Sequence, residues 1–106
     1  MYARRVTMKL KPNSMVEFTQ RLEKDVIPML RKQNGFRDEI TFVASGGAEA
    51  FGLSLWDNKQ SAETYSRAHY GEVTKILENV VDGTPRVETY EVANSTFHKI
   101  SAAATA

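Results

Sequence analysis

Two side chains capable of acid–base chemistry, Tyr65 and His69, lie one helical turn apart in the second half of the chain. Apolar residues recur at helical spacing between residues 62 and 80, so both side chains can face one cavity. An imidazole exchanges protons near neutral pH, and a buried phenol normally takes a hydrogen-bond partner. We therefore predict Tyr65 and His69 as a catalytic pair, with ordinary core packing as the alternative for each.

Three large apolar residues have the size to form the walls of a ligand pocket. Trp56 stands where a predicted strand ends and a helix begins, and its ring can seal the core or shield the reacting carbon of a ligand. Phe18 and Leu22 lie on the apolar stripe of an earlier predicted helix. We predict that all three contact a ligand. In the alternative, Tyr65 and His69 pack directly against Phe18 and Leu22 and leave no void.

The chain has no cysteine, which excludes disulfides, thiolate metal sites and cysteine nucleophiles together. Its two histidines, His69 and His98, lie far apart and without a carboxylate-rich motif beside them. We therefore predict no metal and no cofactor. A small domain without disulfides suits a reducing compartment, so we expect a cytoplasmic protein.

Composition limits the classes of partner. With 106 residues, 42% of them hydrophobic and 25% charged, the chain is expected to form one globular domain. Its net charge of +1 provides no field that would attract nucleic acid or an anionic membrane. No apolar run approaches the roughly 20 residues that a membrane-spanning helix needs. We predict a small, uncharged ligand, no nucleic acid and no membrane partner.

The first half of the chain predicts a strand followed by a helix. Residues 2–10 alternate between apolar and polar side chains, as a half-buried strand does. Ser14 and Glu17 have the spacing of a capping box at a helix start, and Asn34-Gly35 ends the helix. Pro28 removes one backbone hydrogen bond inside this helix, so we predict a bend that wraps it around the sheet.

The second half predicts a hairpin, a helix and a last strand, which completes the order β-α-β-β-α-β. This order is typical of an α+β, ferredoxin-like domain, in which a four-stranded antiparallel sheet carries two helices on one face. The predicted elements are strands at residues 36–44 and 51–56 joined by a loop at 45–49, a helix that begins after Asp57 or Asn58 and ends at 82–85, and a strand at 87–92.

Two helices cover only one face of such a sheet. We predict that the other face carries Val43, Trp56 and the aliphatic stems of Arg5 and Lys9, which need cover from water. A second copy of the chain is the simplest cover, so we expect a homodimer that associates through this face.

The chain is expected to end in an extension of the domain. We assign residues 1–96 to the ferredoxin-like domain and residues 97–106 to a C-terminal extension that is partly disordered. His98 lies in an alternating segment that can add to a sheet edge of its own or of the partner copy, where it would act as a dimer clasp.

Several functions of this fold lack their motif here. The strand at residues 36–42 carries adjacent acids instead of the basic, aromatic surface of an RNA-recognition module. The Cys-x-x-Cys pair of a metal carrier is absent. Residues 11–14 do not supply the glycine-rich, arginine-containing phosphate loop of an acyl phosphatase.

Three segments resemble the dimeric α/β-barrel superfamily, and specifically the antibiotic biosynthesis monooxygenase-like family. They are residues 27–36 with the pattern IPML before NGF, residues 53–62 (LSLWDNKQSA) and residues 85–92 (PRVETYEV). The resemblance runs from about Tyr2 to Val92. It implies a homodimeric barrel with a pocket between each sheet and its own helices. It also implies a cofactor-independent monooxygenase that acts on a small aromatic or apolar molecule.

Two alternatives to this chemistry remain open. The chain is a non-catalytic dimeric domain that binds or sequesters a ligand, for example under stress, or it binds haem. The haem-degrading members of the superfamily use a first-strand asparagine, which is missing here. They also use an aromatic residue, near which Tyr65 falls, and a histidine, at whose place Lys75 stands. Cofactor-free oxygenases rely instead on a dry pocket whose polar groups stabilise a substrate anion.

Overall fold

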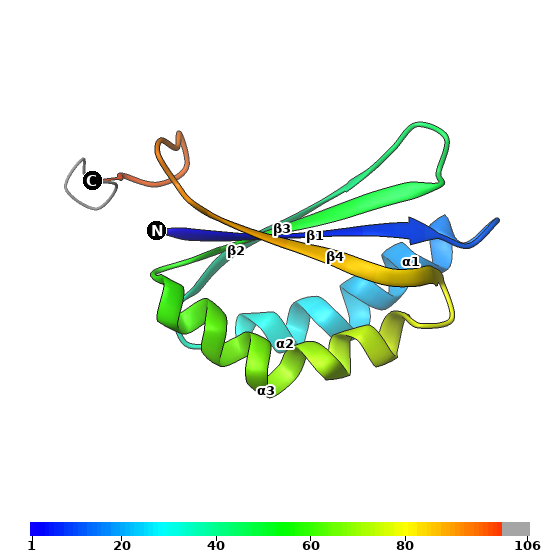
Figure 1. Cartoon of the computed structure of the whole chain (residues 1–106), viewed down its shortest axis with the longest axis horizontal. Helices are drawn as coiled ribbons and strands as arrows, with labels where there is room; N and C mark the ends of the chain where they lie inside the picture. Colours follow the sequence, from blue (N-terminus) through cyan, green and yellow to red (C-terminus); the bar gives the residue numbers. More distant parts are fainter. Residues whose placement is uncertain (101–106) are drawn as a thin grey trace.

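The computed structural model describes residues 1–100 and confirms the ferredoxin-like fold. The four strands form one antiparallel sheet in the order β2-β3-β1-β4, and the helices lie together on one of its faces (Figure 1). None of the helices in this part of the chain is both long and apolar enough to cross a membrane. The elements are β1 (Tyr2–Leu10), α1 (Met15–Arg21), η1 (Leu22–Val26), α2 (Ile27–Arg31), β2 (Phe36–Val43), β3 (Glu49–Trp56), α3 (Lys59–Leu77) and β4 (Val81–Glu91).

The first helical run starts without the predicted capping box. Ser14 precedes α1, but its side chain makes no cap hydrogen bond, and its hydroxyl instead contacts the carbonyl of Pro12 at 3.4 Å. The backbone of Ser14 is already close to helical, with φ −106° and ψ −1°, whereas a capping side chain needs an extended residue. The helix therefore depends on packing of its apolar side, where Phe18 is fully buried.

Pro28 is accommodated by a change of helix type. The five residues before Ile27 form the π-helical turn η1, in which the Ile27 amide donates to the carbonyl of Leu22, five residues back. Pro28 then stands in the first turn of α2, where a missing amide hydrogen costs little. The predicted disturbance at Pro28 is thus a π-turn, which re-aims the side chains of Leu22 and Val26 toward the sheet.

The last strand begins earlier than the sequence predicts. Asn58 caps α3 by accepting a 2.8 Å hydrogen bond from the Ser61 amide, but α3 ends at Leu77. Residues 82–85, expected to end the helix, lie in β4 instead. The pairing with β1 jumps from Thr7–Arg86 to Lys9–Asp82, so residues 83–85 form a bulge with Gly83 at φ +75°.

The inner face of the sheet holds the core, and Trp56 belongs to it. Trp56 was expected on the open face, but it pairs with Tyr2 and Phe36 on the helix side and is fully buried. Val43 also packs against the core. The expectation for Val43 was wrong because the pairing of β2 with β3 shifts by one residue between Phe36 and Asp38, which reverses the alternation along β2. The expectation for Trp56 was wrong because the register of β3 on β1, which pairs Trp56 with Tyr2, turns its side chain toward the helices.

The open face is nevertheless apolar. Phe42 and Phe51 stack there at 4.7 Å between ring centroids, and the Arg5 guanidinium lies 4.4 Å from the Phe51 ring centroid. Phe42 and Tyr90 remain 45% and 44% exposed. We call this surface the outer patch and define it as Arg5, Ile40, Phe42, Phe51, Leu53 and Tyr90, which alternation places on one face.

The segment after β4 folds over the side of the sheet opposite the helices (Figure 1). His98 contacts the Asp38 carboxylate of its own chain through Nε2, and it does not lie in a strand. The expected addition of this segment to its own sheet edge is therefore not seen. The division at residue 96 and an exchange onto a partner stay predictions, and the predicted disorder falls mostly in residues 101–106, outside the described residues.

Candidate functional site

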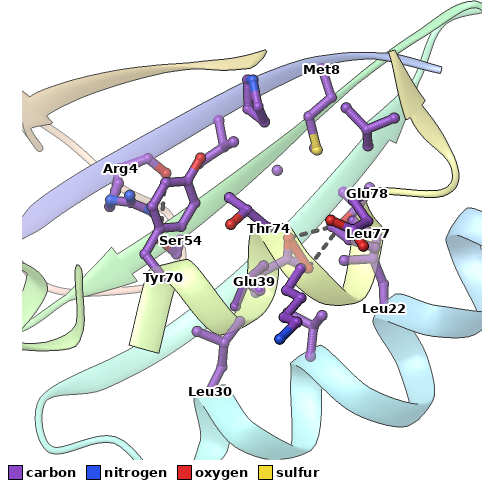
Figure 2. A pocket seen from close by; sticks show the side chains of 18 of the residues that line it. Arg4, Met8, Leu22, Leu30, Glu39, Ser54, Tyr70, Thr74, Leu77 and Glu78 are labelled. Atoms are coloured by element: carbon purple, nitrogen blue, oxygen red, sulfur yellow. Dashed lines mark hydrogen bonds between the residues drawn. The ribbon is translucent and has the colours of Figure 1, made fainter. Parts of the chain in front are cut away.

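A cavity of about 430 Å³ lies between the sheet and its helices (Figure 2). This volume falls in the range of small-molecule sites. All four strands contribute to the sheet-side wall, and α3, η1 and α2 form the opposite wall. The apolar part of the lining consists of Val6, Met8, Leu22, Val26, Leu30, Val73, Leu77, Val81 and Pro85.

A row of polar side chains crosses the sheet at one end of this pocket. Arg4 on β1 pairs with Ser54 on β3, and Ser54 pairs with Glu39 on β2. Residues opposite one another in adjacent strands point to the same face, so all three side chains project toward the helices. Figure 2 shows Arg4 and Ser54 together with Tyr70 at this end. We call Arg4, Ser54 and Glu39 the polar row.

Arg4 is a buried cation that is held mainly by aromatic rings. The residue is 5% exposed, and its guanidinium carbon lies 4.1 Å from the ring centroid of Tyr70 and 5.6 Å from that of Tyr65. Its Nη2 donates to the Ser66 hydroxyl at 3.5 Å, and no ion pair of Arg4 occurs within residues 1–100. Two rings attract the charge through their π-faces but do not neutralise it.

Glu39 faces the pocket from the other end of the polar row. The Thr41 hydroxyl lies 2.8 and 3.0 Å from its two carboxylate oxygens and donates to them. Burial raises the pKa of Glu39, and this hydrogen bond lowers it by less. Gly52 lies beneath the carboxylate, and a Cβ there would come within 3.1 Å of Oε2. The glycine therefore leaves room for the carboxylate to lie flat against β3.

Two tyrosines of α3, Tyr65 and Tyr70, line the pocket beside Arg4. Tyr65 is 4% exposed and stacks on Trp56 with ring centroids 5.0 Å apart. Burial raises the pKa of Tyr65 to about 12, an effect that the charge of Arg4 opposes. Burial also raises the pKa of Tyr70. Both phenols therefore keep their protons at neutral pH and can donate hydrogen bonds to a ligand, but they cannot act as bases there.

The pocket opens between the end of α3 and the bulge of β4. Its rim residues Lys75, Glu78 and Thr84 are exposed, whereas Leu77 and Val81 behind them are buried. The bulge at residues 83–85 widens the gap that an ordinary edge strand would close. Among residues 1–100, no three His, Asp or Glu side chains lie together in a group that could hold a metal ion.

The structure brings only part of the predicted site into the pocket. Tyr65 and Leu22 line it. Trp56 and Phe18 are fully buried behind the lining, where Trp56 supports the Tyr65 ring and donates from Nε1 to the Ser54 hydroxyl at 2.9 Å. These two side chains support the pocket walls but do not line the pocket.

His69 lies outside the lining. Its side chain is 38% exposed, and Nδ1 lies 3.9 Å from the Glu72 carboxylate. The His69 ring stacks on the outer side of Tyr65 with centroids 6.4 Å apart. Four residues overshoot a full helical turn by about 40°, which carries the side chain from the buried stripe to its solvent edge. Tyr65 and His69 are thus neighbours but do not face one cavity.

The sequence held a signal for one of the residues it missed. Arg4 shares its strand face with Tyr2, Val6 and Met8, and a lone charge on an apolar face marks a candidate site. Glu39 gave no such signal, because alternation counted from Phe36 places it outward. Only the shift in pairing at residue 37 turns its side chain into the pocket.

Comparisons with known proteins match this architecture in solved structures only. No protein-family profile and no curated protein sequence matches the chain. A monooxygenase from the gene ActVA-Orf6 of Streptomyces coelicolor, solved in complex with Nanaomycin D, superposes with a TM-score of 0.77 at 14% identity, over 92% of each chain. SnoaB, a cofactor-independent oxygenase from Streptomyces nogalater, has a TM-score of 0.73 at 10% identity, over 90% of this chain and 95% of its own.

A conserved protein from Methanosarcina mazei has a higher identity of 22%, with a TM-score of 0.69 over 85% of this chain and 91% of its own. TM-scores at this level establish the shared fold, and identities this low leave the activity open. The order of elements, the sheet topology and these superpositions agree. The chain has the fold of these monooxygenases and of the putative antibiotic biosynthesis monooxygenases from Nitrosomonas europaea and Deinococcus radiodurans, which is the fold that its three sequence segments predicted.

Proposed function

We propose that this protein binds a small, largely apolar aromatic molecule between its sheet and helices and oxygenates it without a cofactor. The observation that carries the proposal is the pocket of about 430 Å³, whose apolar walls enclose a polar row at one end. Apolar walls exclude water and so strengthen the electrostatic effect of the few polar groups present. The oxygenases of the same fold support this chemistry.

The reaction needs no external electron source when the substrate supplies all the electrons. A methylene group flanked by aromatic rings reacts with O₂ to give a carbonyl and water. One oxygen atom enters the product, and the other leaves as water with the two hydrogens of the methylene. In this proposal Tyr65 and Leu22 contact the ligand, and Trp56 and Phe18 hold the shape of the pocket from behind.

Oxygen uptake with an anthrone as substrate tests the proposal. We expect the wild type to consume one O₂ per anthrone above the buffer rate. Val73→Trp, which fills the pocket from α3, should abolish both anthrone binding and uptake. Val16→Trp makes the same change at a site on α1 that is 66% exposed, and it should retain both. Binding without uptake would instead indicate a non-catalytic ligand-binding domain.

We also propose that two copies associate through the outer patch. Phe42, Phe51 and Tyr90 form an aromatic surface that a single copy leaves partly in water. An apolar patch on a sheet face is typical of an interface, and stacking two such faces produces a closed barrel. Sedimentation velocity measurements over a range of concentrations give the association state.

A further inference from the structure

The polar row carries two opposite charges that do not neutralise each other. The backbones of Arg4 and Glu39 lie two strands apart with Ser54 between them, about 10 Å across the sheet, and both side chains project toward the helices. Neither makes an ion pair within residues 1–100. Charges that face a cavity without a partner cost stability, so a ligand that spans the row has both an anionic and a cationic group available to it.

The groups around Glu39 favour proton transfer over a permanent ion pair. From α3, Tyr65 and Tyr70 line the same pocket as protonated phenols, and Lys75 and Glu78 lie at the exposed rim. The lining residues of η1 and α2 are apolar. Burial raises the pKa of Glu39, which brings a carboxylate closer to the range in which it works as a general base.

We propose that Glu39 is the general base of this site and that Arg4 is the cation that stabilises the anion it generates. The proposal rests on the ligand pocket of the proposed function. It specifies the substrate class as a molecule with an acidic C–H or O–H conjugated to an oxygen, such as an enolisable ketone or a phenol. The reacting atoms lie over Ser54, between the two charges, where the Glu39 carboxylate faces the acidic hydrogen and the Arg4 guanidinium faces the oxygen.

The step balances without an oxidant. A carboxylate oxygen of Glu39 takes the proton from the substrate carbon, and the electron pair of the C–H bond becomes the C=C bond of the enolate. The negative charge moves to the substrate oxygen, where the Arg4 guanidinium and a tyrosine hydroxyl stabilise it. The proton then returns to carbon, or the enolate goes on to react with O₂.

The residues between the two charges are fixed in a way that suits this step. The Ser54 hydroxyl accepts from Trp56 Nε1 and lies 3.4 Å from the Arg4 carbonyl, so the core already engages it. Gly52 leaves room for the Glu39 carboxylate to lie against β3. The ligand therefore meets the two charged ends of the row with little competition from the serine.

Hydrogen exchange of β-tetralone, a bicyclic ketone with acidic C–H bonds, tests the proposal in D₂O without any oxidation. We expect the wild type to accelerate the loss of the α-proton NMR signal above the buffer rate. Glu39→Gln should slow the catalysed exchange by about 10²- to 10⁴-fold, as removal of a general base does. Arg4→Gln should slow it by about 10²- to 10³-fold, as removal of an oxyanion partner does.

Two matched variants separate chemistry from general effects. Glu63→Gln and Arg67→Gln, both on the exposed side of α3, make the same changes away from the pocket, and both should exchange at the wild-type rate. Glu39→Asp keeps the carboxylate on a shorter side chain and should recover part of the rate lost in Glu39→Gln. Circular dichroism and tyrosine fluorescence identify any variant that fails to fold.

A wild-type rate equal to the buffer rate, or unchanged exchange in folded Glu39→Gln, overturns the proposal. Exchange that survives in Glu39→Gln and is lost in Arg4→Gln overturns the assignment of the base. Failure of the oxygenase is distinguishable, because exchange without anthrone oxidation leaves the acid–base assignment standing. If Glu39→Gln oxidises anthrone at the wild-type rate, the assignment of Glu39 as the general base is wrong, whereas the proposed ligand pocket still stands.

Discussion

The two faces of the sheet are distinguished by two consecutive arginines. Arg4 points inward and lies 4.1 Å from the ring centroid of Tyr70, and Arg5 points outward and lies 4.4 Å from that of Phe51. The side chains make the same kind of contact. Arg4 faces a walled cavity, where its charge acts at low dielectric, and Arg5 lies on an open sheet surface.

The apolar residues of the two faces differ in the same way. On the inner face, Trp56 is surrounded by Phe36, Tyr65 and the helices and is fully buried. On the outer face, Phe42 stacks on Phe51 and remains 45% exposed. The comparison indicates that the inner face supplies the stability of one chain and forms the sheet-side wall of the pocket. The outer face leaves apolar side chains partly exposed.

Replacement of one large aromatic residue on each face should give the widest contrast. We expect Trp56→Ala to lower the free energy of unfolding by about 3–5 kcal/mol, because it leaves a cavity among packed rings. Phe42→Ala should cost about 1 kcal/mol in the isolated chain, mostly the stacking on Phe51. Urea denaturation at low protein concentration measures both. Equal losses would contradict the division of roles between the faces.

Alkaline pH should weaken the inner face through Tyr65. Its pKa is raised from 10.0 to about 12, so the folded state holds this proton more tightly than the unfolded state does. The resulting stability is fully present below pH 10 and is lost as pH rises from 10 to about 12, by about 3 kcal/mol. Urea denaturation at several alkaline pH values should show a steeper loss in the wild type than in Tyr65→Phe. Parallel curves would argue against this burial effect.

A charge placed in the outer patch should act on association and spare the fold of the single chain. Phe42→Glu is expected to weaken a homodimer by about thirtyfold or more, as the loss of a central aromatic contact does. Val16→Glu introduces the same charge at an exposed apolar residue of α1 and should leave association unchanged. Sedimentation velocity reports the result. A wild type that stays monomeric at high concentration would contradict the proposed interface.

Local patterns were enough to predict the order of the elements. Alternation identified the strands, and helical spacing identified Tyr65 and Leu22 as residues that line the pocket. Both signals come from neighbours along the chain. The same spacing placed His69 on the buried side of its helix, but its side chain is partly exposed. The apolar spacing of a helix does not show where the sheet stops covering it.

The features that were missed depend on pairing between distant strands. Gly83 and Pro85 read locally as a turn, yet β1 keeps them in β4 as a bulge that forms the pocket rim. The shift at residue 37 is fixed by pairing with β3, and it decides that Glu39 faces inward and Phe42 outward. The polar row therefore could not be assembled from the sequence, although Arg4 could have been marked on its strand.

The smallest predicted effect concerns Glu39, whose ionised carboxylate is needed for the proposed reaction but should lower the stability of the folded protein. Because burial raises the pKa of Glu39 above 4.5, the folded state favours the protonated acid. The stability from this proton is present below pH 4.5 and is lost as pH rises through the folded pKa. At neutral pH Glu39→Gln should therefore raise the free energy of unfolding, by less than the other variants are expected to change it.

Acid titration distinguishes this effect from a general gain in packing. The advantage of Glu39→Gln should shrink as pH falls and vanish below pH 4.5, where the wild-type carboxyl is protonated as well. Glu88→Gln on the outer side of β4, where Arg86 lies 3.4 Å from the carboxylate, should show no such gain at neutral pH. Urea midpoints at neutral and acid pH give both values. A neutral-pH loss of stability in Glu39→Gln would mean that the inner carboxylate, like its outer counterpart, is already satisfied by the protein, and would leave the ligand no unpaired charge to use.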